Sequence, residues 1–308
     1  MSMFKNIFIC VSLSMGLFSC DNGPKITDTL SKGTIDISVD ETYKPIIEEE
    51  KRVFDSCYPE ANITIHYKPE AECIKDYFDN KARIILVSRD LSKEEKTLCE
   101  QKQIYASSLP LALDAIAVIV NNTSADSEMG PNVLKGILTG EYKTKYTVVF
   151  DNQSSGMLRY ITDSVLAGAK MGSNVFAAKS DSAVIDYVAQ NPNAVGFVGL
   201  SYVCDPEDNS NSGLFIKNVR VVAMENNPHA AVDNTGLRKF NQPYQAIIAR
   251  QAYPLTRKLF YINRESYPGL GTGFANFLGR EQGQLIFAHA HLFPLRMNIV
   301  IREAKINQ

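Results

Sequence analysis

The residues Ala112-Leu113-Asp114-Ala115-Ile116-Ala117-Val118-Ile119-Val120 form a long apolar run whose only charged residue is Asp114. At this length, a run that is rich in Ile and Val favours a buried strand over a helix. We therefore expect this stretch to be a strand that passes through the centre of the molecule.

On the N-terminal side of this stretch, strand patterns alternate with helix patterns. Apolar and polar residues alternate in two short segments, and a third segment is apolar from Ile84 to Val87, as in a buried strand. Each is followed by a segment that suits a helix. This order predicts a mixed α/β sheet with crossover helices. The expected strands are Thr34–Val39, Ile63–Tyr67 and Ala82–Val87, and the expected helices are Tyr43–Cys57, Glu70–Asp79 and Ser92–Gln103.

On the C-terminal side the pattern restarts and is followed by a third block. We expect helices at Asn132–Leu138, Ser155–Ala167 and Ser180–Gln190, and strands at Tyr146–Phe150 and Val195–Leu200. The third block contains Ala246–Ala249, Leu259–Ile262 and a helix from about Gly273 to His289. The glycine-dense stretch Gly269–Gly273 is interpreted as a flexible turn.

The N-terminus has the pattern of an export signal. The apolar run Ile7–Phe18 is shorter than the roughly 20 residues that span a bilayer, and it follows Lys5. The tetrad Leu17-Phe18-Ser19-Cys20 resembles a bacterial lipobox, which implies that Cys20 is lipidated. We expect a signal peptide at 1–19, a flexible tether at 20–32 and a protein anchored by lipid on the periplasmic side of the cell envelope. The alternative is an ordinary signal peptide with a chance cysteine, and the choice between inner and outer membrane stays open.

The composition predicts a folded domain without affinity for nucleic acid. Of the 308 residues, 45% are hydrophobic and 21% are charged, and the net charge is −2. Four cysteines remain beyond Cys20: Cys57, Cys73, Cys99 and Cys204. In an exported protein they allow three full disulfide pairings, or they are buried apolar groups. No pair has CxxC spacing.

The sequence gives little support for an enzyme, a metal site or a cofactor. Ser154-Ser155-Gly156 is not a GxSxG motif, the four histidines are scattered, and no HExxH spacing occurs. We expect no catalytic residue, no metal and no cofactor.

Several segments, in order and at matching spacing, resemble the substrate-binding component of bacterial phosphate ABC transporters. Each is weak alone, but the ordered set covers about 33–287. The segments are Ser88–Leu91, Asp114–Asn121, Leu134–Gly140, Ser154–Gly156, Asn191–Leu200, Tyr253–Arg257 and Phe277–Gln284.

The resemblance implies a two-lobed periplasmic-binding-protein fold of type II, with mixed sheets flanked by helices and a central ligand cleft. Lobe one is expected at 33–120 plus 251–308, and lobe two at 121–250. Such proteins close over a small ligand like a hinge.

The loops that hold phosphate in that family are altered here. Thr42, Ser155 and Gly156 are retained in these loops, and if phosphate is bound we expect Thr42, Ser88, Arg89, Ser155 and Gly156 to bind it. Carboxylates stand in or beside the same loops, at Asp40, Glu41, Glu70, Glu72 and Asp151. Arg89 is the first candidate for the opposing charge, and Lys44, Lys68 and Arg159 are weaker ones.

We infer that the phosphate pocket has been replaced, and three versions stay open. A carboxylate paired with Arg89 fills the place of the anion, the cleft binds a cationic or zwitterionic ligand, or the cleft is vestigial and the lobes bind another protein. The alternative to a replaced pocket is that each acid faces water at the first turn of a helix, where it complements the helix dipole.

Two functions follow as expectations. The first is a lipid-anchored solute-binding protein for phosphate or another small solute, with an ABC permease as partner. The second is a binding-protein scaffold that serves as an envelope adaptor or sensor, with a TonB-type complex as partner.

Overall fold

We describe a computed structural model of the chain, in which residues 28–204, 215–228 and 239–297 are described. The predicted signal peptide, Cys20 and residues 20–27 of the tether lie outside these ranges. The signal peptide at 1–19 and the lipid anchor at Cys20 therefore stay predictions.

The first part of the chain alternates strands and helices as the sequence indicates. β1 (Gly33–Asp40) pairs in parallel with β2 (Ala61–Lys68) and with β3 (Ile84–Val87). A 3₁₀ turn (Glu41–Tyr43) leads into α1 (Lys44–Cys57), which tolerates Pro45 in its first turn. α2 (Glu70–Phe78) and α3 (Lys93–Gln101) follow, and Ser92 and Glu95 form a capping box at the start of α3.

The quoted apolar stretch lies in β4 (Ser107–Val120), which is the central strand of a single large sheet. Its first part pairs antiparallel with β12 (Thr256–Asn263), and its last part pairs antiparallel with β8 (Ala194–Gly199). The sheet continues through β6 (Thr147–Phe150) to β7 (Val175–Ala177), while β9 (Arg220–Val221) and β13 (Phe293–Pro294) pair with β4 beside this path. The prediction of a central strand is confirmed.

Most of the remaining elements lie around the part of the sheet that β8, β6 and β7 form. They include a small second sheet of β5 (Glu128–Met129), β10 (Ala223–Glu225) and β11 (Phe240–Asn241). The helices are α4 (Pro131–Thr139), α5 (Gly156–Ile161) with a π-helical continuation (Thr162–Leu166), α6 (Asp181–Gln190), α7 (Leu200–Val203) and α8 (Gln245–Ala249).

The C-terminal helix differs from the expectation in two ways. The predicted single helix is two helices, α9 (Leu270–Leu278) and α10 (Glu281–His289), because the chain turns at Gly279. The predicted turn at Gly269–Gly273 is already part of α9 from Leu270 on. The carboxylates of Asp28 and Glu265 accept the free N–H groups of Leu270, Gly271 and Thr272 at this helix start.

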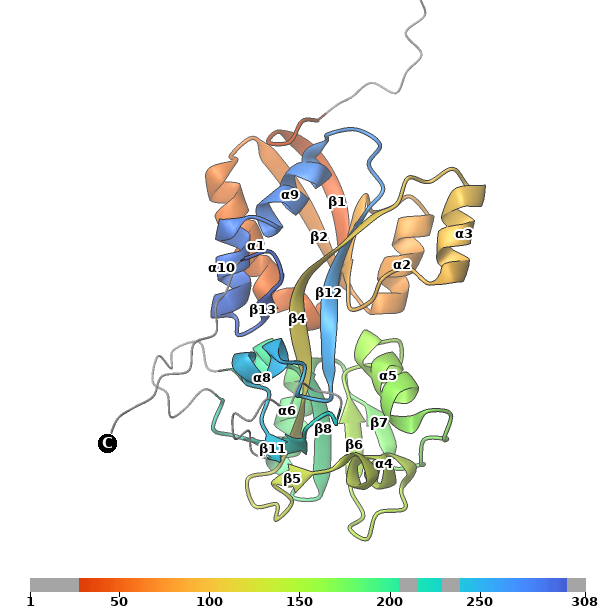
Figure 1. The fold of residues 1–308 in the computed structure, drawn as a ribbon, viewed down its shortest axis with the longest axis vertical. Helices are drawn as coiled ribbons and strands as arrows, with labels where there is room; N and C mark the ends of the chain where they lie inside the picture. The colour runs from red at the N-terminus through yellow and green to blue at the C-terminus, as the bar shows by residue number, and fades with distance from the viewer. Residues whose placement is uncertain (1–27, 205–214, 229–238, 298–308) are drawn as a thin grey trace, which may run out of the picture.

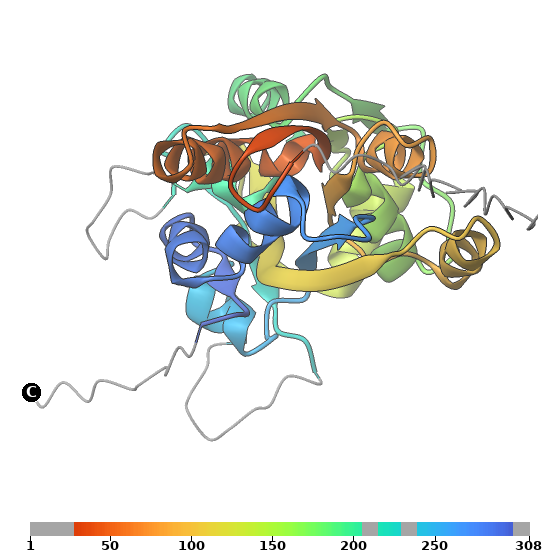
Figure 2. The same ribbon diagram turned by 90° about the horizontal axis from the view of Figure 1, so that it is seen from above.

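Helices cover both faces of the sheet in the upper part of the molecule, which we name lobe one (Figures 1 and 2). α1, α9 and α10 pack on one face and α2 and α3 on the other, each around its own buried cluster. The lower part, named lobe two, holds α4 to α7 and β6 to β8 around a third cluster. β4 and β12 run from one lobe into the other. The domain boundaries at 120/121 and 250/251 stay predictions.

The cysteines do not form disulfides within the described residues. Cys57 is exposed, and Cys73, Cys99 and Cys204 are buried free thiols. In the same residues, we find no helix that is long and apolar enough to cross a membrane.

Candidate functional site

Three chain turns meet between the lobes. Asp40 ends β1, Ser88 follows β3, and Asp151 follows β6. The ends of these strands bring polar side chains to the junction, because binding residues in open α/β sheets gather at carboxyl ends of strands. The starts of α2 and α5 add Glu70 and Gly156 to the same place.

The carboxylate of Glu70 lies at the centre of this junction. It accepts hydrogen bonds from the Ser88 N–H at 3.1 Å and from the Ser88 hydroxyl. Arg159 of α5 donates through Nε to Oε1 at 2.6 Å and through Nη2 to Oε2 at 3.3 Å. Nε of Arg89 lies 3.6 Å from Oε1. N–H, hydroxyl and guanidinium groups of this kind suit an anion, and here they bind a side chain of the same protein.

Gly156 brings the backbone of lobe two directly against this group. A Cβ atom at this position would lie 2.7 Å from Glu70 Oε2, 2.7 Å from Ser88 Oγ and 2.9 Å from Asp40 Oδ2. No side chain fits into so small a space. The absence of a side chain at Gly156 therefore permits the close contact between the lobes.

Arg159 and Ser88 keep Glu70 ionised despite its burial. Burial raises the pKa of Glu70, but hydrogen bonding and charge from Arg159, the Ser88 hydrogen bond and the charge of Arg89 outweigh it, so the pKa lies below its ordinary value. Glu70 therefore carries a negative charge at neutral pH.

A second acidic group lies next to Glu70. Asp40, Asp151 and Asp181 are each at most 1% exposed. Burial raises the pKa of Asp40 to about 7, against the charge of Arg257, and Glu70 and Asp151 add to the rise. Burial also raises the pKa values of Asp151 and Asp181, and for Asp181 the charge of Asp151 is the next cause. Three adjacent buried carboxyls thus favour their protonated forms.

Arg257 is the buried cation of this second group. It lies opposite Asp114 in the pairing of β12 with β4, and its Nε donates to Asp114 Oδ2 at 2.8 Å. Within the described residues, its Nη1 and Nη2 atoms have no hydrogen-bond partner, and neither do Asp40 Oδ2, Asp151 Oδ1 and Thr42 Oγ1. Buried polar atoms normally have hydrogen-bond partners, so a group of unpaired atoms at one place is unusual.

The other residues that the sequence singled out lie around this centre. Arg89 binds mainly Glu95, at 2.6 and 2.8 Å, and reaches Glu70 only at the longer distance given above. Glu41 accepts from the amide of Asn152 in lobe two, and its carbonyl accepts from the Tyr202 hydroxyl at 3.0 Å. Ser155 caps α5. Glu72 is exposed on α2 and does not join the buried group.

Two further sequence candidates for the opposing charge, Lys44 and Lys68, bind elsewhere. Lys44 lies 3.7 Å from Glu48, and Lys68 lies 2.6 Å from Asp76. Arg159, a weaker candidate from the sequence, makes the main ion pair with Glu70. Sequence reasoning missed Arg257 and Asp181, although a lone Asp114 in an apolar strand indicates that a buried cation lies nearby.

The described residues contain no group of three or more His, Cys, Asp or Glu side chains that could hold a metal ion.

Comparison with known proteins identifies the family. The sequence pattern of the PBP superfamily domain matches residues 26–281. The chain belongs to the PBP superfamily. The sequence-based resemblance and the fold class are both confirmed.

Curated relatives of this PBP superfamily member cover most of its length. The protein SphX of Synechococcus elongatus is 23% identical over 261 residues, which are 79% of this chain and 72% of SphX. The phosphate-binding protein PstS of Pseudomonas aeruginosa is 24% identical over 284 residues, which are 84% of this chain and 80% of PstS.

Solved structures share the fold. A Clostridium perfringens protein described as a phosphate ABC transporter substrate-binding protein, with bound phosphate, aligns with a TM-score of 0.70 and 22% identity over 85% of this chain and all of that one. An ABC-type phosphate transport receptor from Vibrio cholerae aligns with a TM-score of 0.63 and 20% identity over 84% of this chain and 99% of that one. At these identities the likeness concerns the fold.

Proposed function

We propose that this PBP superfamily member is a lipid-anchored, extracytoplasmic solute-binding protein whose oxyanion position is filled by its own Glu70. The observation that carries this proposal is the convergence of the Ser88 N–H, the Ser88 hydroxyl and Arg159 on one buried carboxylate. The names of the relatives support a binding component of phosphate transport type, and the acid-rich junction supports a changed ligand.

Electrostatics oppose the binding of phosphate at this junction. Two like charges 4 Å apart repel by about 4 kcal/mol at an effective dielectric constant of 20. Glu70 is ionised and uses the donors that an oxyanion would need. A phosphate ion would have to displace Glu70 and would then face its charge at short range.

Calorimetric titration of phosphate into the purified protein tests this proposal. We expect no binding in the micromolar range by the wild-type chain. Glu70→Ala should increase the affinity for phosphate at least tenfold, because it frees Ser88 and Arg159. Glu72→Ala is the matched control, since Glu72 lies in the same first turn of α2 but is exposed. Micromolar binding by the wild-type chain, or equal affinities for both variants, would contradict the role of Glu70.

The lipid anchor has its own test. Membrane fractionation of cells that express the full chain should place it in the membrane fraction, and Cys20→Ser should move it to the soluble fraction. A Cys20→Ser chain that stays with the membrane would exclude this anchor.

A second candidate is a scaffold that works as an envelope adaptor or sensor. It is favoured by the direct contacts between the two lobes, namely Arg159 with Glu70 and Tyr202 with the Glu41 carbonyl. In vivo cross-linking distinguishes the two. An ABC permease as the cross-linked neighbour supports the solute-binding protein, and a TonB-type complex supports the adaptor. If neither Glu70→Ala nor the wild-type chain binds any small solute, the adaptor is the better description.

A further inference from the structure

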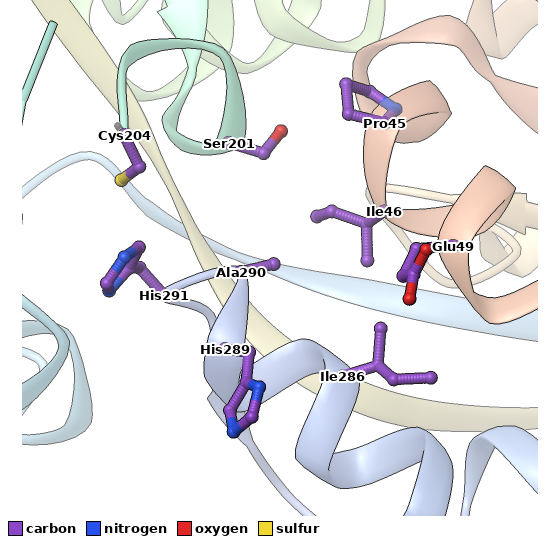
Figure 3. Close-up of a pocket in the computed structure, with 9 residues that line it drawn as sticks. All are labelled: Pro45, Ile46, Glu49, Ser201, Cys204, Ile286, His289, Ala290 and His291. Atoms are coloured by element: carbon purple, nitrogen blue, oxygen red, sulfur yellow. The ribbon is translucent and has the colours of Figure 1, made fainter. Parts of the chain in front are cut away.

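A separate pocket of about 340 Å³ lies where α1, α7 and α10 meet (Figure 3). Its lining comes from both lobes, because α1 and α10 belong to lobe one and α7 to lobe two. It shares no lining residue with the acidic junction of Asp40, Glu70 and Asp151. The function proposed above does not use this pocket.

The inner surface of the pocket is apolar. Pro45 and Ile46 come from α1, and Ile286 and Ala290 come from α10 and the residue after it. In Figure 3 the side chains of Ile46 and Ile286 point toward one another across the space, and Ala290 points into it from a third side. The apolar part of a ligand in this position would remove these side chains from water. The burial of apolar surface contributes a favourable free energy of about 25 cal/mol per Å².

Three polar side chains line the same space and are free to bind a ligand. Within the described residues, the side chains of Ser201, His289 and His291 make no hydrogen bond to another protein group, although the backbone N–H of His291 donates to the Ala288 carbonyl. A few convergent polar groups in a mostly apolar concavity of this size are typical of small-molecule sites.

The lining carries little net charge at neutral pH. The carboxylate of Glu49 is held by Arg52, whose Nε and Nη2 lie 2.8 and 2.5 Å from its oxygens. Burial, and then the nearby His289, lower the pKa of His291, so that its ring is neutral. Burial raises the pKa of Cys204 to about 12, so its sulfur is a thiol and not a thiolate. Within the described lining, the carboxylate of Glu49 already has Arg52 as its partner, and an anionic ligand would find no lysine or arginine.

We propose that this pocket binds a neutral amphipathic molecule, with an apolar ring or short-chain body against Ile46, Ile286 and Ala290 and one hydrogen-bonding group at Ser201 or His291. Because both lobes line the pocket, its occupant contacts both at once. A ligand here therefore binds best to the arrangement of lobes described above.

The test uses the neutral fluorescent probe N-phenyl-1-naphthylamine with the full chain. We expect saturable binding with one site per chain. Ala290→Phe should weaken the binding at least tenfold, because the new ring occupies the pocket. Leu285→Phe is the matched control, since Leu285 is exposed on α10 and does not line the pocket. Ser201→Leu fills the pocket from α7 and replaces Ala290→Phe should that variant fail to fold.

The charge of the ligand is tested with a second probe. 1-Anilinonaphthalene-8-sulfonate has the same aromatic body and a sulfonate, and we expect at least tenfold weaker binding. Equal binding of the two probes would overturn the assignment of a neutral ligand. Absence of binding by the wild-type chain, or unchanged binding by both pocket-filling variants, would overturn the site itself.

Discussion

Nε of Arg159 lies 2.6 Å from Oε1 of Glu70, and this ion pair joins helix α5 of lobe two to helix α2 of lobe one. Glu70 is almost fully buried, while the Arg159 side chain is 35% exposed. The pair is therefore intermediate between a surface salt bridge and a buried one.

The first prediction concerns this pair. Arg159→Ala should lower the free energy of unfolding by about 2 kcal/mol, because it leaves a buried carboxylate with Ser88 and the more distant Arg89 as partners. It should also increase the radius of gyration measured by small-angle X-ray scattering, since the lobes lose their main ionic contact. Arg52→Ala is the control, because its pair with Glu49 is exposed and contributes little. If the two variants lose equal stability, Arg159 does not stabilise the buried carboxylate of Glu70.

The second prediction concerns the close approach at Gly156. Gly156→Ala should separate the lobes and lower the melting temperature, because the new Cβ would overlap Glu70, Ser88 and Asp40 at less than 3 Å. Gly279→Ala is the matched control, since the nearest atom to its Cβ is 3.4 Å away. We expect scattering to report an expanded molecule only for Gly156→Ala. A melting temperature for Gly156→Ala at or above that of the wild-type chain would show that the lobes are not in contact there.

Much of the fold could be predicted from the sequence because its signals are local. The Ile- and Val-rich composition of Ala112–Val120 reflects burial on both faces of the sheet, and β4 indeed lies at its centre. The break between α9 and α10 escapes sequence reasoning because a single glycine such as Gly279 is tolerated inside a helix, and the polar residues that follow it also suit the exposed face of one. The helix start at Leu270 was missed because distant carboxylates, at Asp28 and Glu265, cap it.

The candidate site was less accessible to sequence reasoning. The sequence singles out Asp40 and Glu70 because they stand in the loops that hold the anion in the family that the chain resembles. The structure brings them together, while their role in binding stays a prediction. Glu72 follows Glu70 by two residues and so points to another side of α2. Arg257 is 143 positions from its partner Asp114 in the sequence, and no local sequence pattern predicts a pair at this separation. Long-range charge pairing is set by strand register, which one sequence alone does not reveal.

A third prediction concerns Glu50 on α1. Its side chain is fully buried, and neither carboxyl oxygen has a hydrogen-bond partner within the described residues. Burial, and then the charge of Glu49, raise its pKa to about 9. Glu50→Met should therefore raise the free energy of unfolding at pH 8 by about 1 to 3 kcal/mol, since it removes an unsatisfied polar group and keeps the volume. Chemical denaturation measures the change, and a loss of stability would indicate that Glu50 has a partner that the structure does not reveal.

The fourth prediction follows from the pKa of Asp40, which is about 7 in the folded chain and about 3.8 in the unfolded one. A carboxyl with a raised folded-state pKa stabilises the fold when protonated. This stability is complete below the unfolded pKa and is lost as pH rises through the folded pKa. The difference between the two values corresponds to an upper limit of about 4 kcal/mol. We expect the free energy of unfolding to fall between about pH 4 and pH 7 because of Asp40.

Asp40→Asn separates this contribution from those of the other acids. The amide oxygen can still accept from the Thr42 N–H, as Asp40 Oδ1 does at 3.1 Å, and the side chain carries no charge at any pH. The variant should therefore be more stable than the wild-type chain at pH 8 and similar to it at pH 4, when denaturation is measured at both values. The pKa of Glu50 is about 9, so the loss of stability that its ionisation causes extends to higher pH. Glu50→Met should therefore change how the free energy of unfolding depends on pH above pH 7. Asp40→Asn has little further effect in that range. A pH dependence that is the same in Asp40→Asn and the wild-type chain would mean that Asp40 is already ionised in the closed junction, and that Arg257 compensates its charge.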